Sequence, residues 1–303
     1  MNTEEEIQRR YELQVEFLGS NKPVNQTYPL VSVRTTTYQH GEFIEKCMEG
    51  ILNQKTNFPF ELVIGEDGST DGTAEVCKKY AREYPHLIRL FERDRNLTQL
   101  YDENGKLLRR LNGDFTTRAC RGKYIALCEG DDFWTDPLKL QKQVDFLEKN
   151  PEYQFSFHYS SIQKGDAIVG VRPQSGEGRI TMSNLLFRKS YPTMSLVYRN
   201  DSSLLEDRKK IRNHFITGDF PLVLLLASKG PGYLFPDVMG VYRVHGGGVY
   251  STLSAIKKLQ IGIHNRRSAL RHIPMNFKQR MICRLMIVLR QIKIWGLKIG
   301  LFR

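Results

Sequence analysis

Apolar side chains recur along the first half of the chain with two periods, one typical of strands and one typical of helices. Four stretches have the β-branched and apolar density of buried strands: residues 27–40, 60–66, 86–93 and 122–132. Three stretches instead place apolar side chains at helical spacing: residues 42–54, 73–84 and 136–150. This alternation predicts an α/β domain with a mostly parallel central sheet flanked by helices.

The pattern changes after the third predicted strand. Residues 97–113 predict a hairpin that turns at Asn104 and Gly105. Residues 153–198 have the pattern of strands and turns. They precede a predicted helix at 217–230, a predicted strand pair at 232–245 and a basic helical end.

Three carboxylates crowd the end of the fourth predicted strand, at Glu129, Asp131 and Asp132. Like charges this close repel one another at low effective dielectric, so a fold keeps them together mainly when a cation neutralises them. Oxygen ligands suit Mg²⁺ or Mn²⁺, which could stabilise a diphosphate leaving group. The alternative is structural, because Asp132 and Asp136 precede a helix and would favour its N-terminus.

A second acidic turn closes the strand predicted at 60–66. Glu66 and Asp67 stand at its end, where a carboxylate can accept a hydrogen bond from the imide N–H of a uracil ring. Residues 69–71 favour turns and helix caps, so we expect a structural role for them. We predict that Glu66 and Asp67 contact a nucleotide base.

Three segments of the chain resemble, in their order, the nucleotide-binding half of the family 2 glycosyltransferases. They are VSVRTTTY, FELVIGEDGSTDGT and GKYIALCEGDDFWTDPLKLQKQVDFL. The similarity spans residues 28–150. It implies the glycosyltransferase A fold, a Rossmann-like sheet flanked by helices, here followed by a C-terminal basic helical extension. It also implies site residues: Thr36 and Tyr38 beside the nucleobase, Asp67 with Glu66 on uracil or ribose, and Asp131 with Asp132 as the D-x-D-type pair that holds the metal at the nucleotide.

Two features depart from the family pattern. Arg34 and Thr35 stand where the family often has an apolar residue and proline, and Glu129 stands where aspartate is usual. These departures leave open which groups contact the base and which acid binds the metal.

Two motifs in the second half also resemble the family. Residues 217–220 precede an apolar helix, and Asp219 resembles the general base of an inverting transfer, which takes the proton of the acceptor hydroxyl. A helix N-cap is the alternative role for Asp219. Residues 242–248 resemble the family's closing segment, in which His245 would bind the metal or a phosphate and Arg243 would neutralise phosphate charge. A structural role is the alternative for His245.

For four other side chains the sequence leaves two roles possible. One of Arg95, Arg118 and Arg121 could contact the diphosphate, and the sequence does not choose among them. Trp134 follows the acidic segment, where it could stack on a sugar or fill the core.

The formal charge of +12 is carried by the end of the chain. Residues 251–303 hold twelve Lys or Arg and no Asp or Glu, whereas residues 1–250 hold 33 groups of each sign. Apolar residues with interspersed cations and Trp295 suit a helix lying in a membrane interface with anionic headgroups. Packing on the body or on a second subunit is the alternative. Nucleic acid is not an expected partner, since no nucleic-acid module accompanies the charge.

Cysteine usage and hydropathy bear on the compartment. The five cysteines form no C-x-x-C pair and favour reduced thiols. No secretory h-region is evident, and no stretch reaches the roughly 18 to 20 apolar residues of a membrane span. We expect a cytoplasmic protein that is peripheral on the inner face of the plasma membrane.

Together these features predict an inverting, metal-assisted, hexosyltransferase-type glycosyltransferase that uses a nucleotide diphosphate sugar, with UDP favoured, and Mn²⁺ or Mg²⁺. The expected acceptor is a glycan or a lipid-linked hydroxyl in bacterial surface-polysaccharide synthesis. The predicted segments are an N-terminal helical segment (1–27), a nucleotide-sugar-binding half (28–150), an acceptor-binding half of the same domain (151–250) and the basic tail (251–303).

Two other functions are open. The chain could be a catalytically silent, membrane-docking nucleotide-sugar-binding protein. It could also be a nucleotidyltransferase, although it lacks a Gly-rich, Lys-containing loop after its first strand.

Overall fold

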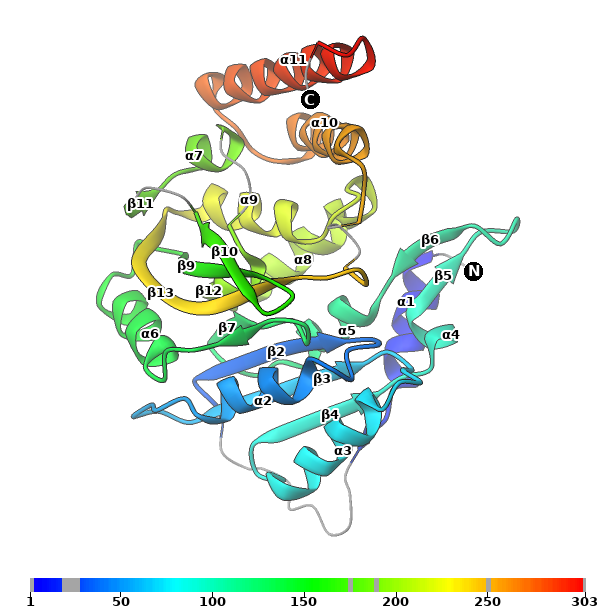
Figure 1. The fold of residues 1–303 in the computed structure, drawn as a ribbon, viewed down its shortest axis with the longest axis vertical. Helices are drawn as coiled ribbons and strands as arrows, with labels where there is room; N and C mark the ends of the chain where they lie inside the picture. The colour runs from blue at the N-terminus through cyan, green and yellow to red at the C-terminus, as the bar shows by residue number, and fades with distance from the viewer. Residues whose placement is uncertain (1–2, 18–27, 174–176, 188–190, 249–251, 302–303) are drawn as a thin grey trace. The chain divides into compact units, whose positions relative to one another are not determined.

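The computed structural model describes residues 3–17, 28–173, 177–187, 191–248 and 252–301 (Figure 1). The chain divides into two compact units, each assembled from separated stretches of sequence. The first unit holds Met1–Asp145, Thr193–Asn200 and Val238–Arg243. The second unit holds Phe146–Pro192, Asp201–Asp237 and Val244–Arg303.

The first unit is built on a sheet with a parallel centre. Its strand order is β1-β4-β3-β2-β7-β12, in which β4, β3, β2 and β7 run parallel and the outer strands run antiparallel to their neighbours. The central strands consist of buried residues, as parallel strands covered on both faces require. The strands are β1 (Glu16–Phe17), β2 (Val31–Thr37), β3 (Phe60–Glu66), β4 (Ile88–Glu92), β7 (Tyr124–Leu127) and β12 (Val197–Arg199).

The register of these strands places three loops at one edge of the sheet. Thr37 pairs with Glu66 across β2 and β3, and Arg34 pairs with Leu127 across β2 and β7. The loops that follow β2, β3 and β7 therefore leave the sheet side by side. In open α/β sheets this edge, at the carboxyl ends of the strands, is where ligands bind.

Amphipathic helices cover the strands of the first unit. Helix α2 buries Ile44, Cys47, Met48 and Ile51, while α3 contacts β3 and β4, and α5 contacts β2 and β3. The remaining elements are the β5–β6 hairpin, the short strand β8 and the 3₁₀ turn η1. The bounds are α1 (Thr3–Glu12), α2 (Ile44–Leu52), α3 (Thr73–Glu83), α4 (Arg95–Thr98), β5 (Gln99–Tyr101), β6 (Leu107–Arg110), α5 (Asn112–Ala119), β8 (Phe133–Trp134), α6 (Lys139–Lys149) and η1 (Thr193–Ser195).

The second unit combines antiparallel strands with helices. Strand β10 pairs with β9, and β11 pairs with the first part of β13. Figure 1 shows α10 and α11 side by side, and both helices are in contact. The bounds are β9 (Phe155–Lys164), β10 (Ala167–Arg172), β11 (Gly178–Ile180), α7 (Met182–Phe187), α8 (Ser202–Ile211), η2 (Arg212–His214), α9 (Asp219–Lys229), β13 (Gly232–Val244), α10 (Ala255–His272) and α11 (Phe277–Lys298).

The structure confirms the α/β class and the mostly parallel central sheet, and it differs from prediction in the strand that follows α9. Where a strand pair was predicted at 232–245, a single strand β13 passes through Pro236. Proline is tolerated in a strand where its missing N–H faces no ladder partner, and residues 236–238 are exposed. Residues 18–27 of the predicted N-terminal helical segment lie outside the described residues, and the predicted segment boundaries stay predictions.

Candidate active site at the strand ends of the first unit

The predicted acidic loop lies directly against the end of β2. The Gly130 backbone N–H donates to the Thr36 carbonyl at 3.0 Å, and the Asp67 N–H donates to the Thr37 carbonyl at 3.1 Å. A Cβ placed on Gly130 would lie only 2.7 Å from Thr37 Oγ1, so glycine permits this close approach. Thr36, Asp67 and the loop at 129–132 are thereby brought to one place.

Glu129 is held by residues of β2. The Arg34 guanidinium forms an ion pair with its carboxylate, and the Thr36 hydroxyl donates to the other carboxylate oxygen. The two departures from the family pattern, Arg34 and Glu129, are thus partners in one contact. The charge of Glu129 is therefore compensated by Arg34, and which acid of the loop binds a metal stays a prediction.

Asp131 keeps its carboxylate partly open. Its side chain is 22% exposed, and Oδ2 lies 3.9 Å from Nε2 of His40. His40 is oriented by Thr37, whose Oγ1 lies 3.2 Å from His40 Nδ1. Asp131 thus combines partial exposure with a neighbouring histidine.

Asp132 is buried and accepts a hydrogen bond from a neighbouring strand. The Arg243 backbone N–H of β13 donates to Asp132 Oδ1 at 2.8 Å. Burial and the charge of Asp131 raise the pKa of Asp132 well above its usual range. Asp132 does not cap the following helix; that role belongs to Asp136, whose Oδ1 accepts from the Leu138 N–H at 2.8 Å.

Arg243 holds the acidic loop through its guanidinium, and its predicted contact with a phosphate stays a prediction. Its Nη1 donates to the Asp131 carbonyl at 3.0 Å and to the Phe43 carbonyl at 3.3 Å. The guanidinium also lies over the Phe133 ring, 4.4 Å from the centroid. The structure therefore gives Arg243 a positioning role in the acidic loop.

Trp134 fills the core behind this loop. Its Nε1 donates to the Met194 carbonyl at 2.8 Å, and the side chain is buried. The Lys139 ammonium lies 3.7 Å from the centroid of the Trp134 ring. Lys139 Nζ is itself fully buried and has no hydrogen-bond partner among the described residues. Burial lowers the pKa of Lys139 to about 7.

The Lys139 environment predicts that stability depends on pH. An unfolded lysine has its ordinary pKa of 10.5, so between about 7 and 10.5 the unfolded chain binds a proton that the folded chain lacks. The free energy of unfolding should therefore rise with pH over this window. Lys139→Met should raise the melting temperature by several degrees at neutral pH, with the gain shrinking as the pH rises. Thermal melts across this range test it, with the exposed Lys149→Met as control; pH-independent gains would contradict the assignment.

The Glu66 side chain is hydrogen-bonded within the turn that follows β3. The Glu66 carboxylate accepts from the Gly68 N–H at 3.0 Å, from the Ser69 N–H at 2.9 Å and from the Ser69 hydroxyl. Burial raises the pKa of Glu66, and the hydrogen bonds from Ser69 oppose that rise. The Glu66 carboxylate is thus hydrogen-bonded within its own turn, and the contact of Glu66 and Asp67 with a base stays a prediction.

Asp67 lies beside an arginine that the sequence could not single out. Its carboxylate accepts from the Thr98 hydroxyl; burial raises the pKa of Asp67, and the charge of Arg95 opposes the rise. The Arg95 guanidinium lies 3.6 Å from the centroid of the Tyr38 ring. Arg95 Nη1 is buried without a hydrogen-bond partner among the described residues. Buried N–H donors are usually hydrogen-bonded, so this position favours a ligand that supplies a hydrogen-bond acceptor.

The other two candidate arginines contact residues outside this site. Arg118 donates to Gln8 at 2.6 Å and lies over the Tyr11 ring. Arg121 pairs at 2.7 Å with Glu61, near the start of β3 and therefore at the opposite end of that strand from Asp67. Of the three arginines, Arg95 is the one beside the candidate site.

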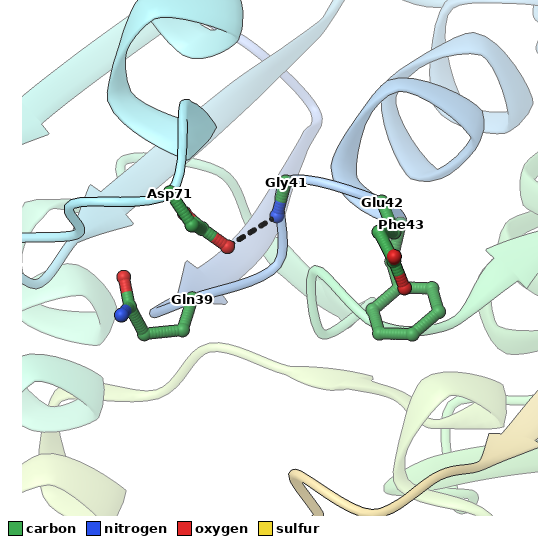
Figure 2. A pocket seen from close by; sticks show the side chains of 5 residues that line it. All are labelled: Gln39, Gly41, Glu42, Phe43 and Asp71. Carbon is green, nitrogen blue, oxygen red and sulfur yellow. Dashed lines mark hydrogen bonds between the residues drawn. The ribbon is translucent and has the colours of Figure 1, made fainter.

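An open pocket of about 370 Å³ lies beside the loop that follows β2 (Figure 2). Figure 2 shows Asp71 joined to Gly41, whose N–H donates to Asp71 Oδ2 at 2.8 Å. Asp71 also accepts from the Thr73 N–H at 3.2 Å, so the predicted structural role fits its contacts. Gln39, Glu42 and Phe43 complete the lining.

The second unit places Asp219 at the first position of α9. Gly218 occupies the N-cap position without a side-chain cap, and Asp219 is half-buried. The preceding loop is held by Asn265 of α10, which accepts from the Ile216 N–H at 3.0 Å and donates to Thr217 Oγ1 at 2.9 Å. Asn265 is a positioning residue that only the tertiary structure reveals.

His245 also belongs to the second unit and follows β13 directly. Its carbonyl accepts from the Gly248 N–H at 3.3 Å, which closes a turn through the glycine run. Residues 249–251, where the predicted closing loop continues, lie outside the described residues.

A divalent cation fits the strand-end site through few protein ligands. Among the residues that the structure describes, no group of three or more His, Cys, Asp or Glu side chains is placed to hold a metal ion. Mg²⁺ and similar ions at nucleotide sites take one or two carboxylates and complete their shell with phosphate oxygens and water. The partly exposed Asp131, next to Asp132 with its raised pKa, meets this smaller requirement.

The parallel sheet with loops at its carboxyl edge defines an open α/β fold, and sequence comparison gives its family. Residues 32–196, more than half of the chain, match the family described as Glycosyl transferase family 2. The chain belongs to this family of glycosyltransferases.

Two relatives illustrate the sequence similarity. An uncharacterized protein of Mycobacterium tuberculosis (strain ATCC 25618 / H37Rv) is 34% identical over 222 residues, which cover 73% of this chain and 60% of the relative. A Bacillus subtilis (strain 168) protein, TuaG, named provisionally as a teichuronic acid biosynthesis glycosyltransferase, is 30% identical over 143 residues, 46% of this chain and 51% of the relative. The chain thus spans 60% or less of the length of these two relatives.

Two solved structures share the fold. Staphylococcus aureus TarS 1–349 in complex with UDP-GlcNAc has a TM-score of 0.60 at 17% identity, covering 87% of this chain and 72% of that chain. The mannosyltransferase PcManGT of Pyrobaculum calidifontis, in complex with GDP-Man and Mn²⁺, has a TM-score of 0.60 at 19% identity, covering 93% and 74%. These similarities confirm the expected glycosyltransferase A type of fold.

Proposed function

We propose that this glycosyltransferase moves a hexose-type sugar from a nucleotide diphosphate sugar, with UDP favoured, to an acceptor hydroxyl with inversion at the anomeric carbon. The observation that carries the proposal is the meeting of Thr36, Asp67 and Asp131 at the ends of adjacent parallel strands. Base, ribose and diphosphate of one donor could be bound by these neighbouring loops. The nucleotide complexes of TarS and of the mannosyltransferase support this use of the fold.

In the proposal, the base end of the donor is bound by Asp67, Tyr38 and Arg95. The Asp67 carboxylate would accept the uracil imide N–H, and the Tyr38 ring would border the base. Arg95 supplies a buried N–H that lacks a partner among the described residues and suits a carbonyl or phosphate oxygen. Thr36 is placed beside them but donates to Glu129, so its contribution is to fix the acidic loop.

Asp131 is the principal metal ligand in the proposal, with Asp132 beside it. Mn²⁺ or Mg²⁺ bound there would neutralise charge on the leaving diphosphate. The Asp132 oxygen that accepts from Arg243 is already occupied, so its contribution would come through the other oxygen. His245 remains a candidate for a further ligand or a phosphate contact.

Asp219 is the proposed general base. As the acceptor oxygen attacks the anomeric carbon opposite the departing phosphate, its proton passes to the Asp219 carboxylate. Asp219 is half-buried at the start of α9, where its Oδ1 accepts from the Phe220 N–H at 2.8 Å, so in the proposal the other carboxylate oxygen takes the proton. Asn265 fixes the loop that presents it.

The proposed acceptor is a glycan or lipid-linked hydroxyl in bacterial cell-surface polysaccharide synthesis. The similarity to TuaG, whose name refers to teichuronic acid biosynthesis, supports this choice. Such an acceptor would place the enzyme in the cytoplasm, peripheral on the inner face of the plasma membrane.

A thermal-shift experiment with nucleotides tests the donor site. UDP at about 100 times its dissociation constant should add roughly 2.7 kcal/mol of stability, a rise of several degrees, when Mn²⁺ is present and much less when EDTA replaces it. Mn²⁺ alone and uridine with Mn²⁺ are the controls. Failure of UDP, GDP and ADP to stabilise the chain under any metal condition would contradict the proposal.

The reaction itself separates the proposal from its alternatives. Slow hydrolysis of the sugar donor should release UDP. Stabilisation by UDP without any turnover would favour a silent binding protein, and release of pyrophosphate would favour a nucleotidyltransferase.

A further inference from the structure

Helix α11 presents an apolar stripe on its exposed face. The residues recur every three or four positions over the whole helix and beyond its end, which places them along one side. All are exposed: Phe277, Met281, Leu285, Val288, Ile292, Trp295 and Ile299. Trp295, the largest of them, is 62% exposed.

The opposite side of α11 is already packed. Cys283 and Ile287 are buried, and α11 contacts α10 and α7 within the second unit. The exposed stripe is therefore not the face by which the helix attaches to its own unit. A contiguous apolar face of this length on a protein surface indicates an interaction site.

Cations flank the stripe on both sides. At helical spacing, Arg280, Arg284 and Lys298 lie along one border, and Lys278 and Lys293 lie along the other. No Asp or Glu occurs between residues 251 and 303. An apolar centre with cationic borders is complementary to a bilayer surface, with acyl chains beneath and anionic headgroups around them.

We infer that the exposed face of α11 docks in the plane of an anionic lipid bilayer. The apolar stripe enters the headgroup–acyl boundary, Trp295 sits at the interface, and the flanking cations meet lipid phosphates. No helix formed by the described residues is long and apolar enough to cross a membrane, which fits a helix lying on the surface. A second copy of the chain is a poorer occupant, because two such faces would bring their cationic borders together.

This inference deepens the membrane placement under the proposed function, and it rests on α11 alone. It requires no donor, metal or acceptor. Vesicle binding and donor turnover are therefore separate measurements, and failure of one leaves the other intact.

Flotation of the full chain with vesicles tests the inference. The chain should float with vesicles of equal parts phosphatidylcholine and phosphatidylglycerol, hardly at all with phosphatidylcholine alone, and less as salt rises. The triple substitution V288S/I292S/W295S should lower partitioning by at least about tenfold. R284E/K298E should also lower it, and more strongly at low salt.

The matched control removes equally exposed apolar side chains elsewhere. Ile168 and Val169 of β10 are 58% and 59% exposed, so I168S/V169S should bind vesicles like the unaltered chain. Equal melting temperatures would show that all variants are folded. Unchanged vesicle binding by the α11 triple variant would overturn the inference. A second outcome would also overturn it: the unaltered chain is a dimer, the triple variant is a monomer, and neither binds vesicles. A second copy of the chain, not a bilayer, would then cover this face.

Discussion

Asp131→Asn should lower kcat/KM for sugar transfer by roughly 10²- to 10³-fold or more, because a preorganised charge that meets the developing diphosphate is worth several kcal/mol. Asn is nearly isosteric, so folding should be unaffected. The loss should be accompanied by a loss of metal dependence: UDP should stabilise the variant equally with and without Mn²⁺. Donor turnover and thermal shift, measured on the same preparation, check both effects.

A second acid of the same segment provides the control for Asp131. Asp136 pairs with Lys142 at 2.7 Å and accepts from the Leu138 N–H, so it serves the start of α6. Asp136→Asn should lower the melting temperature slightly and leave the metal dependence of UDP binding intact. Equal loss of metal dependence in both variants would show that general destabilisation, not ligation, explains the effect.

Asp219→Asn should reduce transfer by about 10²- to 10⁴-fold, the contribution typical of a general base. Binding of UDP should be unchanged, because the proposed donor contacts lie in the first unit. The melting temperature should hardly move, because the amide oxygen of Asn can accept the same hydrogen bond that Asp219 Oδ1 accepts from the Phe220 N–H at 2.8 Å. Rates with donor and acceptor, and nucleotide thermal shifts, measure these two readouts.

An exposed acid in the β9–β10 turn gives the comparison for Asp219. Asp166→Asn in that turn should transfer sugar at the normal rate. Asn265→Ala offers a further test. It removes the hydrogen bonds that hold the loop at 216–217 but does not alter Asp219 itself, and it should slow transfer. Normal transfer by Asp219→Asn would assign the base to another residue.

The sequence was sufficient for the core of the fold because buried parallel strands have a strong local signal. The prediction for residues 60–66 matches β3, and the strand predicted within residues 27–40 is β2. Helices α5 and α7 were missed. Several of the buried residues of α5 are polar, such as Asn112 and Thr116, and α7 has only 6 residues, so their apolar periodicity is weak.

The site was harder to predict because the roles of its acids depend on contacts between distant residues. Nothing local distinguishes Glu66 from Asp67, yet Glu66 is occupied by its own turn and Asp67 faces Thr98 and Arg95. Likewise, the choice among three arginines required the positions of Tyr38, Tyr11 and Glu61. Such pairings depend on register and tertiary packing, which spacing along the chain does not encode.

The contact between Arg34 and Glu129 links two positions that are 95 residues apart. Replacing Arg34 alone would leave the Glu129 carboxylate without its partner in a half-buried position. Shortening Glu129 alone would leave the Arg34 guanidinium without its partner. Substitutions at these two positions should therefore be tolerated as a pair and resisted singly. Any attempt to graft the usual aspartate of the family into this enzyme would have to exchange its distant partner in the same step.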